Sequence, residues 1–88
     1  MTWIIDFETA ARKQMKKLPR NVQSQILDYL EYKVATLENP RSRGEGLKAN
    51  LSGLWRYRVE NYRIICRIMD DKLIVAVVKV GHRREVYD

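Results

Sequence analysis

Cysteine and histidine are scarce in this 88-residue sequence, and their scarcity excludes several kinds of site. Cys66 is the only cysteine, so no disulfide can form within the chain. His82 is the only histidine, which excludes a ribonuclease that uses two histidines of one chain as acid and base. The carboxylates are scattered, so ligand spacing predicts no metal site. The four glycines form no phosphate-binding loop, and we expect no cofactor.

Long hydrophobic runs are also missing. The longest strongly apolar run, Ile74–Val78, is far too short to span a bilayer. Residues 1–3 lead directly into a strand-like segment, without the basic and apolar regions of a signal peptide. Neither a membrane anchor nor an oxidising compartment is indicated, so we expect a cytoplasmic protein with no membrane partner.

The sequence does contain a sizeable apolar fraction and an excess of positive charge. Hydrophobic residues make up 45% of the chain, and its length suits one compact domain, so residues 1–88 are interpreted as a single domain. The net charge is +6, and residues 41–88 carry eleven Lys/Arg against six Asp/Glu, a balance of +5. This excess predicts a local positive field that binds a polyanion, RNA above all. A solvated basic surface is the alternative.

The first half of the chain has the periodicity of one strand and two helices. Residues 3–7 alternate as a short strand, and apolar residues recur at helical spacing from Ala11 to Leu18. Asp6 or Thr9 is expected to cap this first helix. The same 3–4 spacing continues after Leu18, which predicts that a second helix follows.

This second helix is predicted to have Pro19 in its first position and to run to about Glu38. Asn39-Pro40 should end it, because the residue before a proline is disfavoured in helices. Residues 39–53 contain Pro40 and three glycines among charged residues, which is typical of a loop.

The second half of the chain predicts an antiparallel meander of strands 54–59, 62–69 and 73–80. Glu60-Asn61 suits a two-residue turn because Asn tolerates positive φ, and Asp70-Asp71 is the next turn. Residues 73–80 are almost continuously apolar, which is typical of a central strand buried on both faces. The predicted fold is therefore α+β, β-α-α-β-β-β: two N-terminal helices packed on one face of a small, mainly antiparallel sheet.

The register of the first hairpin predicts which side chains share a face. With Glu60-Asn61 in the turn, Arg58 lies opposite Arg63, and opposed residues point to the same side. One face is then apolar and is expected to pack against the helices: Trp55, Tyr57, Val59, Tyr62, Ile64 and Cys66. The other face carries Arg56, Arg58, Arg63 and Arg67. Four guanidiniums on one open face predict a bound phosphate; the alternative is that they are solvated or pair with Glu45, Glu60 and Glu85.

The polar tail after Gly81 carries His82, Arg84 and Tyr87, and is expected to curl back beside the arginine face. Cations lower the pKa of a neighbouring tyrosine, which can then take a proton from a ribose hydroxyl. The alternative is that Tyr87 is an ordinary surface or packing residue. Without a metal, nuclease chemistry needs the 2′-hydroxyl as nucleophile, which confines it to RNA.

Several segments together resemble the RelE branch of the RelE/ParE toxin superfamily, over essentially the whole chain. These are residues 3–7, Lys17-Leu18-Pro19, Asn39-Pro40, 54–59, 62–64 and 80–87. The resemblance implies the RelE/ParE-like fold and the toxin of a type II toxin–antitoxin system. It further implies a ribosome-dependent mRNA endonuclease, or mRNA interferase, which cuts mRNA in the ribosomal A site and inhibits translation.

The resemblance also implies roles for single residues. Arg56 and Arg58 correspond to two basic strand residues that stabilise the reacting phosphate, Arg63 to a phosphate-binding arginine and Arg83 to an arginine that supports the leaving group. Tyr87 corresponds to the proposed general base. Further RNA contacts are expected from Lys48, Arg67, His82 and Arg84. Well-known members have lysines at the two strand positions, and arginine cannot exchange a proton as lysine does. This difference shifts acid–base work towards Tyr87, with His82 as a second candidate.

The expected partners follow from the same resemblance. They are a cognate antitoxin with an acidic segment that folds on the toxin, the A site of the 70S ribosome with its mRNA, and operator DNA through the antitoxin complex. Two alternatives remain open: a ParE-like toxin that inhibits gyrase without nuclease activity, and a non-catalytic member that binds only RNA or antitoxin.

Overall fold

The computed structural model describes residues 2–86 and has the predicted α+β architecture. In chain order the main elements are β1 (Ile4–Phe7), α1 (Thr9–Lys16), α2 (Arg20–Tyr29), β2 (Glu45–Gly46), β3 (Trp55–Val59), β4 (Tyr62–Met69) and β5 (Ile74–His82). A π-helical turn (Leu30–Val34) extends α2, and two 3-10 turns (Pro40–Ser42 and Ala49–Leu51) flank β2.

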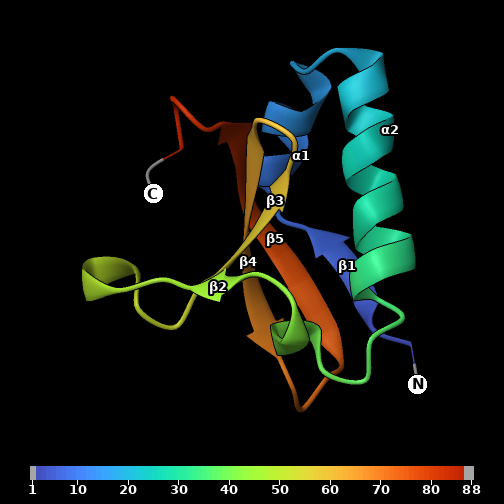
Figure 1. Cartoon of the computed structure of the whole chain (residues 1–88), viewed down its shortest axis with the longest axis vertical. Helices are drawn as coiled ribbons and strands as arrows, with labels where there is room; N and C mark the ends of the chain where they lie inside the picture. Colours follow the sequence, from blue (N-terminus) through green and yellow to red (C-terminus); the bar gives the residue numbers. More distant parts are fainter. Residues whose placement is uncertain (1, 87–88) are drawn as a thin grey trace.

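Five strands form one sheet in the order β1-β5-β4-β3-β2. β1 is parallel to β5, and the other neighbours are antiparallel, so the sheet is mainly antiparallel as predicted. Figure 1 shows α2 alongside one side of the sheet, with the loop after β2 and the end of the described chain on the other side. β2 was missed in the sequence, because two residues are too few for a recognisable alternation.

The core lies between the helices and the sheet. The apolar stripe of α1 and α2 meets the inward-facing side chains of β3, β4 and β5, among them Tyr57, Ile64, Val75 and Val77, which are all fully buried. β5 is an interior strand between β1 and β4, as its apolar sequence predicted, although Lys79 near its end is exposed. The predicted apolar face of the hairpin is therefore the face that packs against the helices.

The predicted helix boundaries were wrong in three places. Glu8, and neither Asp6 nor Thr9, occupies the N-cap of α1, and its side chain makes no capping hydrogen bond. Its carboxylate binds Arg67 instead, at 2.7 Å. Pro19 is the N-cap of α2 rather than its first helical residue.

The helical segment ends at Val34 and not near Glu38. The amide of Ala35 donates to the carbonyl of Leu30 at 2.8 Å, a wider turn than in an α-helix. Leu30 and Val34, at the two ends of this turn, are both buried in the core. Trp3, just before β1, binds the carbonyls that follow the end of the helical segment. Its amide donates to the carbonyl of Ala35 at 2.8 Å, and its indole donates to the carbonyl of Glu38 at 3.3 Å.

The segment between helices and hairpin is tied to the sheet at several points. The hydroxyl of buried Tyr57 donates to the carbonyl of Pro40 at 2.7 Å, and the indole of Trp55 donates to the carbonyl of Arg43 at 2.6 Å. Arg41 binds Asp70 in the β4–β5 turn through two hydrogen bonds of 3.0 and 2.9 Å. These contacts hold β2 at the edge of β3.

Candidate active site

The predicted register of the β3–β4 hairpin is confirmed and places three arginines together. Arg58 lies opposite Arg63, and Arg56 lies opposite Ile65, all on the face away from the helices. The positive φ of the turn falls on Glu60 (55°) rather than on Asn61, so the turn residue was misidentified although the register was right. β5 continues this row, because Gly81 lies opposite Arg63.

The four arginines of this face are not equally open, contrary to the sequence prediction. Arg56 and Arg63 are only 8% and 7% exposed, whereas Arg58 and Arg67 are exposed. One Nη of Arg63 donates to the carbonyls of Glu60 and Tyr62, at 3.3 and 3.2 Å. These contacts hold its guanidinium against the hairpin turn.

Glu45 bridges two of the arginines. One carboxylate oxygen lies 3.4 Å from Nη2 of Arg56 and 3.6 Å from Nη2 of Arg58. Pairing of the arginines with Glu45 was one of the alternatives left open by the sequence, and it is confirmed for these two. Glu45 and Arg58 are exposed at this contact, whereas Arg56 is buried.

The strand that carries Glu45 depends on a glycine. Gly44 has φ +78°, and a Cβ there would lie 2.4 Å from the carbonyl oxygen of Arg56. Only glycine allows this approach, which puts Glu45 opposite Arg56 in the sheet. The sequence named Glu45 among the possible partners of the arginines, but it did not predict the strand that presents Glu45, because residues 39–53 are typical of a loop.

A hollow of about 220 Å³ lies beside Glu45 and Arg56. Lys48 and Leu51 are among the residues that line it. Lys48, predicted to bind RNA, thus lines the same hollow as Arg56. Arg67 is directed elsewhere, because its guanidinium reaches towards the other edge of the sheet and binds Glu8 at 2.7 Å.

The tail turns back over the arginine face, as the sequence predicted. The Arg83 amide donates to the carbonyl of Asn61 at 2.7 Å, and the Val86 amide donates to the carbonyl of His82 at 3.0 Å. Val86 is only 3% exposed, and a Cβ at Gly81 would lie 2.7 Å from its Cγ2. Gly81 shares a row with Arg63, so its missing side chain leaves the space that Val86 fills on this face.

The predicted site residues of the tail are partly placed. His82 is half-buried, its Nδ1 accepts the Arg84 amide at 3.2 Å, and its ring packs edge-on against Tyr62. Arg83 and Arg84 are both exposed at the end of the hairpin. Tyr87 lies outside the described residues.

Two buried groups are unsuited to proton transfer. Burial raises the pKa of the Tyr57 hydroxyl and of the Cys66 thiol far above their ordinary values. Both side chains lie on the helix-covered face, away from the arginines. Within residues 2–86 no three His, Cys, Asp or Glu side chains gather as metal ligands would. In the same residues, every helix is too short or too polar to span a bilayer.

Comparisons with known proteins agree with the resemblance in the sequence. The model of the family described as ParE toxin of type II toxin-antitoxin system, parDE, matches residues 5–87. The chain is 31% identical to the mRNA interferase toxin RelE of Escherichia coli over 91 residues, which cover 99% of this chain and 92% of that protein. It is 28% identical to toxin RelG of Mycobacterium tuberculosis over 87 residues, covering 99% and 98% of the two chains.

Solved structures show the same fold. A chain of the toxin–antitoxin complex RelBE2 from Mycobacterium tuberculosis superposes with a TM-score of 0.86 at 26% identity, covering 97% of this chain and 95% of that one. A chain of the archaeal RelE–RelB complex from Pyrococcus horikoshii has a TM-score of 0.68 at 22% identity, covering 98% of this chain and 100% of that one. The chain therefore belongs to the RelE/ParE superfamily and is a RelE-type toxin of a type II toxin–antitoxin system.

Proposed function

We propose that this protein is a ribosome-dependent mRNA endonuclease that cuts mRNA in the ribosomal A site. One observation carries the proposal. Arg58, Arg63 and Gly81 form a continuous row on the open face, and Val86 of the tail packs over Gly81 on the same face. Residues of the hairpin and of the tail are thus brought to one face of the sheet, which supports a common role.

The proposed reaction is transesterification within the RNA chain. The 2′-hydroxyl oxygen of one nucleotide attacks the adjacent phosphorus and gives up its proton to a base. The bond from phosphorus to the 5′-oxygen breaks, and that oxygen takes up a proton. The products are a 2′,3′-cyclic phosphate and a 5′-hydroxyl, and this chemistry is proposed to need no metal or cofactor.

The arginines supply electrostatic stabilisation in this scheme. Negative charge builds up on the phosphate oxygens in the transition state, and preorganised donors stabilise it more than the ground state. Arg63, held by two backbone carbonyls, has a fixed fork for these oxygens. Arg56 and Arg58 contribute a second pair of donors once the phosphate displaces Glu45. Arg83 is proposed to stabilise the leaving oxygen.

The proton acceptor must be a group other than arginine, because a guanidinium keeps its proton at any working pH. Tyr87 is the proposed acceptor, with His82 as the second choice from the sequence. Glu45 is a further candidate, because a phosphate that displaces it from Arg56 and Arg58 would leave its carboxylate close by. Replacing a true general base lowers the rate by about 10²–10⁴-fold. Single-turnover rates of Tyr87→Phe, His82→Gln and Glu45→Gln therefore identify the acceptor.

The proposed RNA contacts extend beyond the reacting phosphate. Lys48, Arg67, His82 and Arg84 are proposed to bind mRNA or ribosomal RNA of the 70S particle, mainly through phosphates. Each phosphate contact that is lost should lower the dependence of affinity on salt. The protein is proposed to act in the cytoplasm, and to bind operator DNA only through its antitoxin complex.

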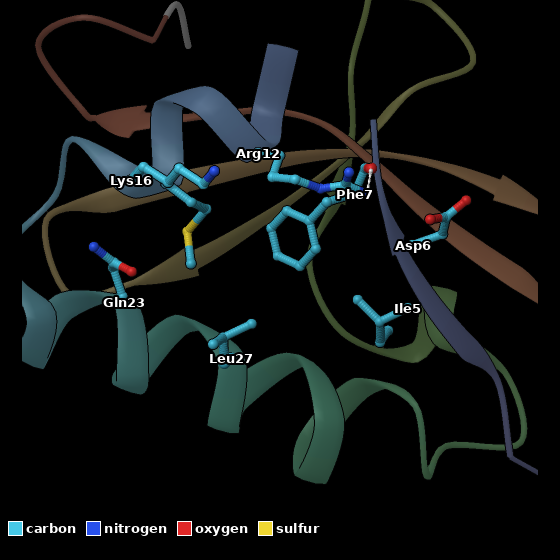
Figure 2. Close-up of a pocket in the computed structure, with 8 residues that line it drawn as sticks. Ile5, Asp6, Phe7, Arg12, Lys16, Gln23 and Leu27 are labelled. Atoms are coloured by element: carbon cyan, nitrogen blue, oxygen red, sulfur yellow. Dashed lines mark hydrogen bonds between the residues drawn. The ribbon is translucent and has the colours of Figure 1, made fainter. Parts of the chain in front are cut away.

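A cognate antitoxin is the proposed protein partner, and a groove on the helix side suits it. Ile5, Phe7, Met15 and Leu27 are among the residues lining a groove of about 330 Å³ between β1, α1 and α2. Figure 2 shows Ile5, Phe7 and Leu27 pointing into it, with Arg12 and Lys16 on the α1 side. An apolar floor with basic residues beside it suits an acidic amphipathic segment that folds on binding.

The test adds the purified chain to programmed ribosomes and maps the mRNA ends, with free mRNA in parallel. Cuts confined to the A-site codon, and present only with ribosomes, are expected. Intact mRNA at high concentrations of protein shown to be folded would overturn the proposal. Leu27→Glu should leave cleavage unchanged and weaken neutralisation by the antitoxin, because it places an acidic side chain in the groove.

The second candidate function is inhibition of DNA gyrase, which the family model's description as ParE favours. A gyrase inhibitor does not need the converging arginines, so Arg63→Ala and Arg83→Ala would leave its toxicity intact. A nuclease would lose toxicity with either variant. If both variants stay toxic and mRNA stays intact, gyrase supercoiling is the next assay, and a non-catalytic RNA or antitoxin binder is the remaining alternative.

A further inference from the structure

The end of β5 is held on one side by a helix rather than by a strand. β1 pairs with β5 only from Ile4 to Phe7, and the last contact of this pair is the amide of Glu8 with the carbonyl of Val77, at 2.9 Å. β5 runs on for five more residues, to His82. α1 packs against β5, and its residues Gln14, Lys17 and Leu18 line a hollow with Lys79 and Val80 of this overhanging part.

A single side chain of α1 binds the backbone of the overhang. The Val80 amide donates to Oε1 of Gln14 at 2.8 Å, and the contact is partly buried. Gln14 therefore takes the place that a backbone carbonyl of a neighbouring strand would otherwise fill. Gln14 and Val80 also line a hollow between α1 and the tail, together with Lys17 and Glu85.

The overhang needs this support because its register shifts just before it. Ile65 pairs with Lys79, whereas the next residue, Cys66, pairs with Val77, so Val78 is an extra residue on β5. A bulge of this kind bends the strand and redirects the residues after it. The bulge alone does not fix the direction of the strand end. The hydrogen bond between the Val80 amide and Gln14 fixes the strand again beyond the bulge.

The residues directly after Val80 belong to the site. Gly81 provides the seat for Val86, and His82 accepts the amides that close the tail turn. Arg83 follows and is bound through its amide to Asn61. Gly81, on which Val86 packs, is the next residue after Val80, and Arg83 is the third. A displacement of Val80 is therefore expected to move both.

We propose that Gln14 is a positioning residue for the cleavage reaction, in that its side-chain oxygen fixes the end of β5 and thereby the placement of Arg83 and the tail on the arginine face. This inference rests on the proposed function. Gln14 itself lies on the helix side of the sheet and does not touch the arginine row. Its effect is therefore expected in the rate of the chemical step and not in substrate binding.

The test compares three variants of the full chain. Gln14→Met keeps the length of the side chain and removes the acceptor, Gln14→Glu keeps an oxygen acceptor, and Gln25→Met makes the same replacement on the exposed side of α2. In the programmed-ribosome assay, Gln14→Met should lower kcat by about tenfold with KM within about twofold, because small misplacements of catalytic groups are costly. Gln14→Glu and Gln25→Met should stay within about twofold of the parent.

A second readout is independent of cleavage. Amide exchange at Val80 should accelerate by up to about tenfold in Gln14→Met, as expected for one lost hydrogen bond. The amide resonances of His82 and Arg83 should shift in this variant and stay in place in Gln14→Glu and Gln25→Met. Chemical denaturation of each variant ensures that kcat is compared between folded proteins.

The two readouts separate the possible failures. If exchange at Val80 accelerates while kcat is unchanged, the hydrogen bond is structural only and the positioning role is overturned. A loss of kcat in Gln14→Glu equal to that in Gln14→Met also overturns it. If the parent protein cuts no mRNA, the proposed function fails, and unchanged His82 and Arg83 resonances in Gln14→Met would then refute the positioning role separately.

Discussion

Successive residues of each strand point alternately to the two faces of the sheet, and the two faces differ in what covers them. On the helix-covered face, Tyr57, Ile64 and Cys66 are completely buried under the helices. On the open face, Arg56 and Arg63 are nearly as inaccessible, but Arg63 contacts the hairpin turn and Arg56 contacts Glu45 of β2. Burial of apolar side chains on the helix-covered face stabilises the fold. This stabilisation offsets the cost of holding the like-charged arginines side by side on the open face.

The largest expected effect tests the stabilising face. Ile64 and Ile65 are neighbours on β4 that point to opposite faces, and both are buried. Ile64→Ala should lower the free energy of unfolding by about 3–5 kcal/mol, because its tightly packed site cannot collapse. Ile65 adjoins a hollow of about 210 Å³ whose residues can relax, so Ile65→Ala should cost about 2–3 kcal/mol.

Urea denaturation of both variants measures this difference. Equal losses would mean that the open face stabilises the protein as much as the helix-covered face, which would contradict the comparison.

The next effect tests whether the open face is uniform. Arg58 lies in the row with Arg63 and contacts Glu45, whereas Arg67 is bound to Glu8 towards the other edge. Arg58→Ala should lower the single-turnover rate on programmed ribosomes by about 10²–10³-fold, the usual loss for one transition-state donor. Arg67→Ala should change it by less than about threefold, because an exposed phosphate contact affects binding more than chemistry. Similar losses in the two variants would show that the active face extends across the whole sheet.

A smaller effect tests whether Val86 of the tail packs on Gly81 of the sheet. Gly81→Ala places a Cβ 2.7 Å from Cγ2 of Val86, so the tail must move away from the arginine row. The expected loss of stability is about 1–3 kcal/mol, as for other overpacked sites, together with a loss of cleavage. The double variant Gly81→Ala/Val86→Ala should be no less stable than Val86→Ala alone, because the clash is gone. Strictly additive losses would show that Val86 does not occupy the space above Gly81.

The smallest effect concerns the ion pair between Arg41 and Asp70, which ties the segment before β2 to the β4–β5 turn. Arg41 lowers the pKa of the Asp70 carboxyl chiefly through their hydrogen bonds. A carboxyl with a lowered pKa stabilises the folded state above its ordinary pKa, and this contribution is lost as the pH falls through the lowered value. Asp70→Asn should therefore make the urea midpoint less sensitive to acid between about pH 5 and about pH 2. An unchanged acid dependence would mean that the pair adds nothing to stability.

Much of the site could be predicted from the sequence because hairpin register follows from a simple alternation. The two-residue turn places Arg58 opposite Arg63, and the period of two then assigns every side chain of both strands to a face. The helices were found for a similar reason, since apolar residues at spacings of three and four face one side. The end of the second helix was not found, because the segment beyond it bonds to the amide and the indole of Trp3, far away in the sequence.

Glu45 shows what local patterns miss. Its strand has only two residues, and the contact with Arg56 and Arg58 exists because Gly44 allows the chain to approach β3. Gln14 is a second case, since its partner Val80 lies 66 residues away in the sequence. The sequence named Glu45 only as one of three possible partners of the arginines, and neither contact follows from a periodic pattern, so spacing alone does not predict it.

The sequence by itself determined the fold class, the pairing of β3 with β4 and the face on which the arginines lie, because these depend on local periodicity and one short turn. The tertiary structure decided which arginines are buried, which carboxylates they meet and how the tail sits over Gly81. Those features depend on contacts between segments far apart in the chain, whose distances and directions are set only when the helices, the β2 loop and the tail pack on the finished sheet.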